Sequence, residues 1–424
     1  MNLNVNLPLL HPGQARIWRE RTRLNAVRCG RRWGKTKLIT TLSGNCAIKG
    51  GKVGIFTPEH KQWLEIYDEL VGALFQVKSR SSKTEGALRT ITGGAIDFWS
   101  VNDNELAGRG REYDLVLGDE MAFTKSNMLK NIWPKAIKPT MLTTRGTAWV
   151  MSTPHGDDPD NFFWAACNDP KLEFKEFHAP SSDSPYVPAD ELEKERKNNH
   201  PLVFRQEFLA EFVDFSGTAF FPLAWLLDNG KPIDEPAIVD YVFAVIDTAI
   251  KDGRQHDGTA CTFFAVNKIY GAPLIVLDWD IISIQGAFLE NWLPSVFARL
   301  EDMARRMQAR NGSVGVWIED KASGSVLLQQ CEQHRWPAQA VPSGLTAAGK
   351  SGRAVNISGH VYQNKVRLTR HAHDKVVDYH GASRNHFITQ VCGFRVGAKD
   401  MGEDDLLDTF TGGVAIALGG PEGF

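Results

Sequence analysis

One stretch near the N-terminus has the residue types of a phosphate-binding loop. Residues 28–36 read Arg-Cys-Gly-Arg-Arg-Trp-Gly-Lys-Thr, after an apolar segment ending at Val27 and before a segment, 37–42, that suits a helix. A strand, a loop and a helix N-terminus in this order present backbone N–H groups to a phosphate chain. We therefore predict a nucleotide site made by Cys29, Gly30, Arg31, Arg32, Trp33, Gly34, Lys35 and Thr36.

Two residues of this loop would carry its chemistry. The Lys35 ammonium would reach the β- and γ-phosphates, and the Thr36 hydroxyl would hold Mg²⁺. The loop departs from G-x-x-x-x-G-K-[ST], because Cys29 stands at the first glycine and Gly30 comes one position late. Alone, the stretch fits a glycine-hinged turn with an exposed lysine equally well, so the rest of the chain must decide.

A second acidic motif strengthens the nucleotide interpretation. Residues 115–118 form an apolar segment that ends in Asp119 and Glu120, which is the Walker B pattern. Asp119 would hold Mg²⁺ and Glu120 would act as the general base on the attacking water. A further apolar segment ends in Ser152 and Thr153, whose hydroxyls can donate to a phosphate. The alternation of strands and helices predicts a doubly wound α/β domain.

The second half of the chain repeats strand patterns in a different order. We expect strands at 241–249, 258–266 and 273–279, then a long helix at 285–310 and a fourth strand at 314–320. Three strands in a meander, a helix and a parallel strand follow the order of an RNase H-type fold. The sequence therefore predicts a second α/β domain of that type.

Acidic residues stand at the ends of these elements. Asp247 ends the first strand, and either Glu319 or Asp320 ends the fourth, because strand alternation turns only one of them inward. The last helix begins with Asp404 and Asp405 and carries Asp408 one turn on. Each acid alone reads as a helix cap or strand end. Together they predict a site for two Mg²⁺ or Mn²⁺ ions that cleaves phosphodiesters.

Composition bounds the alternatives. A chain of 424 residues is long enough for two or three domains. Its six cysteines are scattered without a C-x-x-C pair, so reduced thiols are expected rather than a zinc site or disulfides. A formal net charge of −2 gives nucleic-acid binding no global support. We expect a P-loop ATPase domain with a helical lid at its end at 1–212, a linker at 213–240 and a nuclease domain at 241–424.

No segment predicts a membrane span or a signal peptide. No apolar run reaches the ~18 residues of a spanning helix, and the first residues lack a basic region before an apolar one. The chain is accordingly expected to have no membrane partner and not to be secreted.

The two halves together resemble the large terminase subunit of tailed bacteriophages. The resemblance rests on the deviant loop 29–36, the Arg109-Gly110 segment before Asp119-Glu120, Ser152-Thr153-Pro154, and Gln206-Glu207-Phe208. In the second half it rests on Asp247, residues 317–324, Lys350 with Arg353, and residues 404–408. Singly most of these motifs are weak, but they extend over nearly the whole chain.

The resemblance implies a function and partners. Such enzymes hydrolyse ATP with Mg²⁺ to pump double-stranded DNA through a portal protein into a procapsid, and they cut concatemeric DNA. A small terminase subunit recruits them, they form a ring on the portal, and they work in the host cell cytoplasm. Gln14 would read the adenine. The arginine finger would be Arg31 in the loop, or Arg109 or Arg111 from a neighbouring subunit.

The surface that tracks DNA is left open. Either of two groups of basic residues could form it, or each could be merely a solvated face. They are Arg16, Arg19, Arg21 and Arg23, or Lys125, Lys130, Lys135 and Lys138.

Two other classes of protein fit parts of the sequence. A helicase-like or repair ATPase with an appended nuclease would show a second motor half, and none is visible after residue 212. A silent scaffold would have lost its chemistry, whereas Lys35, Asp119, Glu120 and Asp247 are intact.

Overall fold

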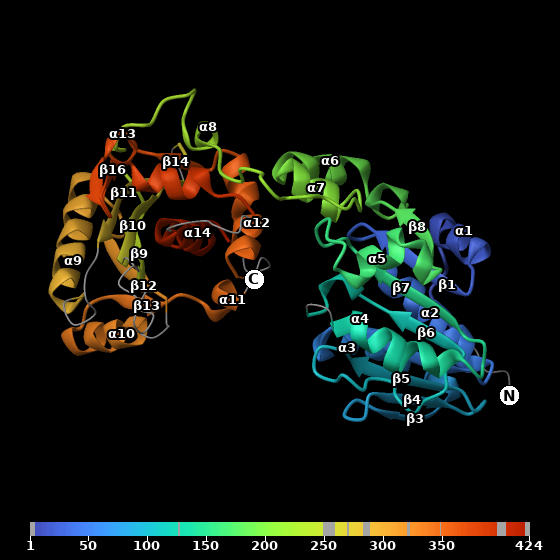
Figure 1. Cartoon of the computed structure of the whole chain (residues 1–424). Coiled ribbons are helices and arrows are strands. Elements are labelled where there is room, and N and C mark those ends of the chain that lie inside the picture. The colour runs from blue at the N-terminus through green and yellow to red at the C-terminus, as the bar shows by residue number, and fades with distance from the viewer. Residues whose placement is uncertain are drawn as a thin grey trace. The chain divides into compact units, whose positions relative to one another are not determined.

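The chain folds into two compact α/β units (Figure 1). The structure is a computed structural model that describes residues 5–125, 128–248, 259–268, 271–282, 289–319, 323–347, 349–396 and 404–419. The first unit comprises Met1–Arg196 and Pro201–Asp214, and the second comprises Lys197–His200 and Phe215–Phe424. Most of the expected linker 213–240 therefore belongs to the second unit, in which Phe220 and Phe221 are fully buried.

An eight-stranded sheet forms the centre of the first unit, in the order β3-β4-β5-β2-β6-β7-β1-β8. Six strands are parallel: β5 (Ala95–Ser100), β2 (Lys52–Thr57), β6 (Leu115–Gly118), β7 (Thr147–Ser152), β1 (Leu24–Cys29) and β8 (Lys175–Ala179). Its helices are α1 (Pro12–Glu20), α2 (Lys35–Ile48), α3 (His60–Ala73), α4 (Met128–Ile132), α5 (Phe162–Asn168), α6 (Ala189–Asn198) and α7 (Pro201–Glu207). The predicted doubly wound α/β class is confirmed.

The polar residues 78–90 form a hairpin at the edge of the sheet. β3 (Lys78–Ser82) pairs antiparallel with β4 (Ala87–Thr90), which pairs with β5. On β4, Leu88 is buried, whereas the neighbouring Arg89 forms an ion pair with Asp97. The hairpin ends the sheet with a polar edge strand, and polar edges are the usual protection of a sheet against further pairing. Such a hairpin is hard to recognise from sequence, because polar edge strands lack a strong apolar pattern.

The second unit has the strand order expected of an RNase H-type fold. Its sheet runs β13-β12-β9-β10-β11-β14, with β9, β10 and β11 antiparallel and β12 parallel to β9. The strands are β9 (Tyr241–Thr248), β10 (Thr259–Val266), β11 (Leu274–Ile282), β12 (Ser313–Ile318), β13 (Ala338–Ala340) and β14 (Val366–Leu368). The small pair β15 (Val377–Tyr379) and β16 (Ala382–Arg384) stands apart from it.

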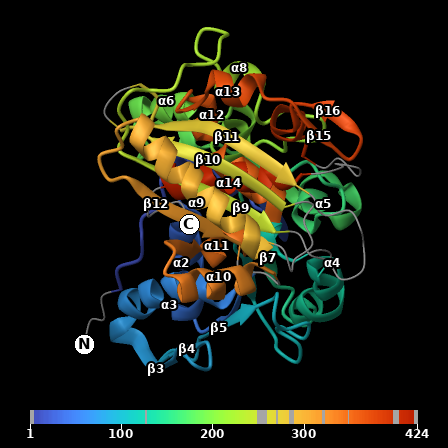
Figure 2. The ribbon, with the colours of Figure 1, turned by 90° about the vertical axis from the view of Figure 1, so that its left-hand side faces the viewer.

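Helices cover both faces of this sheet. The long helix α9 (Leu289–Arg306) lies on one face and α14 (Asp405–Leu418) on the other (Figures 1 and 2). Val242, Ala244 and Ile246 of β9 pack in the core beneath α9, so the alternating residues face α14. The remaining helices are α8 (Leu223–Leu226), α10 (Ser323–His334), α11 (Ser343–Ala347), α12 (Gly349–Tyr362) and α13 (Arg370–Asp374). Burial of both faces explains why the strands read as continuous apolar runs.

Two adjacent glycines of α14 offer a matched test of this packing. A Cβ on Gly413 would lie 2.3 Å from the Phe264 ring, which is itself stacked on Phe243, whereas a Cβ on Gly412 would stand 3.5 Å from Val245. Gly413→Ala should lower the free energy of unfolding by ~1–3 kcal/mol, because the buried ring cannot move aside. Gly412→Ala should be neutral or stabilising by up to about 1 kcal/mol. Calorimetry of the full chain measures both, and equal effects would contradict the close packing.

Candidate functional site

The predicted phosphate loop connects β1 to α2, and neighbouring residues pack closely against its two glycines. Gly34, the N-cap of α2, has a φ of 107°, a conformation that favours glycine, and a Cβ there would meet the Gln14 amide at 2.7 Å. Gly30 is equally confined, because a Cβ would lie 2.4 Å from the Phe208 carbonyl oxygen. Both glycines are therefore required by geometry at their positions.

The departure at Cys29 has a structural explanation. Cys29 is the last residue of β1, and its side chain is fully buried with Sγ 3.7 Å from the carbonyl oxygens of Val27 and Ser152. Burial raises the pKa of its thiol to about 12, so it is a neutral core residue. The residue at this position thus belongs to the strand rather than to the loop, and a side chain is tolerated.

Gln14 lies beside the loop, and its side-chain amide forms hydrogen bonds with backbone groups. Its Nε2 donates to the Gly34 carbonyl at 2.9 Å, and its Oε1 accepts from the His11 N–H at 3.1 Å. His11 caps α1, and its Nε2 lies 3.0 Å from the carbonyl oxygen of Trp33, which is buried. His11 was not among the predicted site residues, and its only signal in the sequence is its place before Pro12 at a helix start. The adenine-reading role of Gln14 stays a prediction.

The two Walker motifs meet in a single polar contact. The Nζ of Lys35 lies 2.8 Å from Oε1 of Glu120, and the Ser152 hydroxyl donates to Oε2 at 3.2 Å. Glu120 has a φ of 52°, an uncommon conformation for a residue other than glycine, at the point where β6 turns away. β6 and β7 are neighbours in the sheet, which is why their ends bring Glu120 and Ser152 together. Thr36 follows Lys35 on the first turn of α2 and is half-buried.

Burial controls the charges of this group. Burial alone lowers the pKa of Lys35, but the carboxylates of Glu120 and Asp119 nearby outweigh it and raise the pKa above its ordinary value. Burial raises the pKa of Asp119 to about 6, although Lys35 opposes this rise. Without a ligand, the protein therefore holds a charged lysine beside an aspartate that ionises reluctantly.

Asp119 should make the stability of the ligand-free protein depend on pH. Because its folded pKa exceeds the ordinary 3.8, the folded state binds the proton more tightly, and stability falls as pH rises from about 4 to about 6. Asp119→Asn cannot ionise, so relative to the parent chain it should gain roughly 1–3 kcal/mol between pH 4 and pH 7. Thermal unfolding in EDTA at both pH values measures this gain. The exposed Asp68→Asn is the control, and an equal gain there would overturn the assignment.

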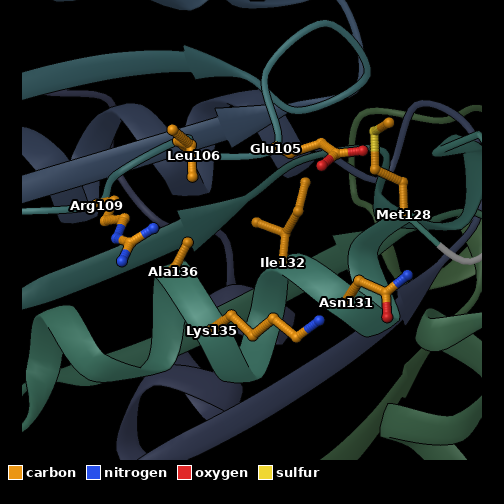
Figure 3. Close-up of a pocket in the computed structure, with 8 residues that line it drawn as sticks. All are labelled: Glu105, Leu106, Arg109, Met128, Asn131, Ile132, Lys135 and Ala136. Carbon is orange, nitrogen blue, oxygen red and sulfur yellow. The ribbon is translucent and has the colours of Figure 1, made fainter.

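The three candidate arginine fingers have different surroundings. Arg31 is 67% exposed and its Nε lies 2.7 Å from Glu207, whose carbonyl also accepts from the Arg31 N–H. Arg111 stands 3.8 Å from Asp97. Arg109 lines a pocket of about 350 Å³, on a turn that faces the helix carrying Ile132 and Lys135 (Figure 3). Arg32, within the loop itself, is exposed and has a φ of 61°.

Several of the basic residues considered for DNA tracking contact neighbouring residues of the protein. The Arg21 guanidinium lies 3.7 Å from the centre of the Trp18 ring, and Arg23 donates to the Gly146 carbonyl. Lys130 pairs with Asp160 at 3.0 Å and Lys125 with Asp103 at 4.0 Å. The choice between the two groups stays open.

In the second unit, three predicted acids gather around one cavity. Asp247 near the end of β9 and Glu319 after β12 lie on adjacent parallel strands, and the Glu319 N–H donates to the Ile246 carbonyl at 3.3 Å. Asp408 approaches from α14, and all three line the same cavity with Arg353 and Leu345. Strand alternation explains the arrangement, because Asp247 shares the α14-facing side of β9 with Val245. Asp320 lies outside the described residues.

The acids at the start of α14 face two cations of α12. Lys350 Nζ lies 2.6 Å from Asp404 Oδ1 and 3.2 Å from Asp408 Oδ2, and Arg353 Nη2 lies 2.5 Å from Asp408 Oδ1. Asp405 is the first residue of α14 and its charge acts on Asp247. Lys350 and Arg353 belong to the motifs that carry the terminase resemblance, but the sequence alone predicts no contact between them and these acids.

These carboxylates perturb one another. Burial, followed by the charges of Asp408 and Glu319, raises the pKa of Asp247 well above its ordinary value. Burial also raises the pKa of Asp408, against the opposing effect of Arg353 and Lys350. Within the described ranges, no three acidic, histidine or cysteine side chains are already arranged as a metal cage. The donor set nevertheless suits hard divalent ions, which would relieve this repulsion.

The described helices include none that is long and apolar enough to cross a membrane.

Comparisons of sequence give two informative relatives. No protein-family model matches the chain. The large terminase subunit of Thermus phage G20c is 32% identical over 137 residues, which span 28% of this chain and 27% of that protein. The large terminase subunit of Escherichia phage T5 is 30% identical over 112 residues, or 26% of this chain and 25% of that protein. The matches thus span about a quarter of the length of these curated relatives.

Comparison of structures extends the similarity to the whole chain. The large terminase of a thermophilic bacteriophage has a TM-score of 0.65 at 12% identity, over 96% of this chain and 99% of that chain. A structure of the same phage terminase in complex with ADP has a TM-score of 0.62 at 11% identity, over 97% and 100%. The chain thus has local sequence identity with two large terminase subunits, and it shares its fold with a third along nearly the entire length.

Proposed function

We propose that the protein is a DNA-packaging ATPase that moves double-stranded DNA into a procapsid and cuts concatemeric DNA with a metal-dependent nuclease. One observation carries the proposal: a chain that shares its whole-length fold with a phage large terminase holds a Lys35–Glu120–Ser152 contact in one unit and an acidic cavity in the other. That thermophilic phage terminase has been solved with ADP and with ATP-γ-S, which supports nucleotide binding by the first unit.

In the motor unit, ATP binding would change the partners of Lys35. The phosphates would take the Lys35 ammonium away from Glu120, and the loop N–H groups between Gly30 and Lys35 would hold the remaining oxygens. Glu120, released from this ion pair and oriented by Ser152, would accept a proton from the attacking water. Thr36 and Asp119 would hold Mg²⁺, which supplies charge neutralisation at the phosphates.

Three arginines are candidates for the arginine finger, and a contact of the loop would couple hydrolysis to motion. Arg31 would act in cis after leaving Glu207, or Arg109 or Arg111 would act in trans on a neighbour's nucleotide. Because Glu207 binds Arg31 through both its side chain and its carbonyl, a change at the loop would reach α7 directly. Gln206 extends this connection, since its Oε1 accepts from the Gly156 N–H beyond the β7 end.

In the nuclease unit, Asp247, Glu319 and Asp408 would hold the divalent ions, with Asp404 and Asp405 as further candidates. Two Mg²⁺ or Mn²⁺ ions would supply an activated water and stabilise the leaving oxygen. The protein's own part is to bring carboxylates from two strands and a helix to one cavity. The portal protein, the small terminase subunit, a ring of subunits and the host cytoplasm belong to the proposal on the strength of the family alone.

The proposal is tested on the purified full chain with two assays. We expect ATP hydrolysis that linear double-stranded DNA stimulates, and plasmid cleavage in Mn²⁺ that EDTA abolishes. A chain inactive in both assays would be a silent scaffold. Stimulation by single-stranded DNA, together with strand unwinding, would instead favour a helicase-like ATPase. Packaging of DNA by procapsids with portal, with and without the small subunit, then tests the partners.

A further inference from the structure

Two cations of α12, Lys350 and Arg353, contact the acids at this cavity and differ sharply in exposure. Lys350 and Arg353 are three residues apart, so they share one face of the helix. The Arg353 side chain is only 7% exposed, whereas that of Lys350 is 40% exposed. In the described part of the chain, the buried Nε of Arg353 has no hydrogen-bond partner. Arg353 is therefore held in the cavity by its carboxylate contacts.

The two cations contact different carboxylate oxygens of Asp408. Arg353 Nη2 binds Oδ1 at 2.5 Å, while Lys350 Nζ lies 3.2 Å from Oδ2 and also binds Asp404 at 2.6 Å. Arg353 additionally lies 3.9 Å from Glu319 through Nη1. The planar guanidinium thus spans two acids from different elements, whereas the lysine covers oxygens that a hard divalent ion would use.

Solvation decides which cation can leave. Removing a buried guanidinium from its carboxylates leaves uncompensated charges in a dry site, which is strongly unfavourable. Lys350 loses much less, because its flexible stem can carry the ammonium into water. We propose that Lys350 is an exchangeable counter-ion that a divalent metal displaces, and that Arg353 is a fixed positioning residue holding Asp408 and Glu319 for that metal. This inference rests on the proposed nuclease function.

The two roles predict opposite effects on metal affinity. Lys350→Gln removes a competitor, so Mn²⁺ should bind about tenfold more tightly, as expected for losing one nearby positive charge. Arg353→Gln removes the same charge but also the alignment of two ligands, so Mn²⁺ should bind at least tenfold more weakly. Arg353→Lys keeps the positive charge but lacks the planar guanidinium that spans two acids. It should therefore recover only part of the Mn²⁺ affinity. A purely electrostatic role would make both Gln variants bind more tightly.

The measurement is Mn²⁺ binding to the nucleotide-free full chain, by calorimetry and by the electron paramagnetic resonance signal of free Mn²⁺. Lys268→Gln, an exposed lysine of the same unit, controls for net charge and should leave affinity unchanged. Asp247→Asn identifies the binding that belongs to this site. If no Mn²⁺ binding depends on Asp247, the proposed nuclease site itself fails.

If binding depends on Asp247 but Lys350→Gln leaves affinity unchanged or weaker, the counter-ion proposal alone is overturned. Tighter Mn²⁺ binding by Arg353→Gln would contradict the positioning role of Arg353. If Arg353→Gln does not fold, Arg353→Lys takes its place in the test. The Lys350→Gln result tests independently whether the metal displaces Lys350.

Discussion

Glu120→Gln is expected to reduce ATP turnover by about a thousandfold while leaving ATP binding intact. A glutamine keeps the size of the side chain and can still accept from Ser152, but it cannot take the proton of the attacking water. It also loses the ion pair with Lys35, so the lysine becomes available to phosphates without first breaking a charged contact. Nucleotide affinity should therefore stay equal or rise slightly.

Steady-state hydrolysis and binding of a fluorescent ATP analogue separate these two effects. Glu69→Gln is the matched control, because it removes another lysine–glutamate contact of the same unit, with Lys37 of α2 at 2.7 Å. That variant should hydrolyse ATP at the parent rate. Normal turnover in Glu120→Gln would show that the base lies elsewhere, and nuclease activity should persist in both variants.

Asp247→Asn is expected to abolish DNA cleavage, with a loss of at least a hundredfold, and to leave ATP hydrolysis unchanged. Asp247 lies between Glu319 on the neighbouring strand and Asp408 on α14, so its loss removes the shared ligand of the cluster. Without this ligand, the remaining acids would hold divalent ions poorly. Plasmid cleavage in Mn²⁺ over a time course measures the loss.

The same substitution should stabilise the metal-free protein at neutral pH. The folded pKa of Asp247 lies above its ordinary value, so its ionisation destabilises the fold as pH rises through the range between the two values. Asn removes this charge, and the thermal midpoint in EDTA should rise, while the increase produced by Mn²⁺ should shrink. Asp234→Asn, an exposed acid of the same unit, should change neither quantity. Parent-level cleavage by Asp247→Asn would place the nuclease site elsewhere.

Local patterns in the sequence were sufficient to predict the fold class and to select the candidate residues. The loop 29–36, the acidic ends of β6 and β9 and the order of strands in the second half are all features of neighbouring residues. Such features are readable because a strand end or helix start imposes its requirements within a few positions. The edge hairpin β3–β4 is harder to recognise, because most of its residues are polar and leave no apolar period.

Contacts between distant segments were decided only by the tertiary structure. Nothing in the order of residues shows that Lys35 meets Glu120, that Glu207 closes on Arg31, or that the two oxygens of Asp408 are divided between Lys350 and Arg353. Each of these contacts depends on which strands are neighbours and on which face of a helix is buried. Those choices are made by packing of the whole core, in which a charged side chain gains a partner only where the surrounding elements bring one within reach.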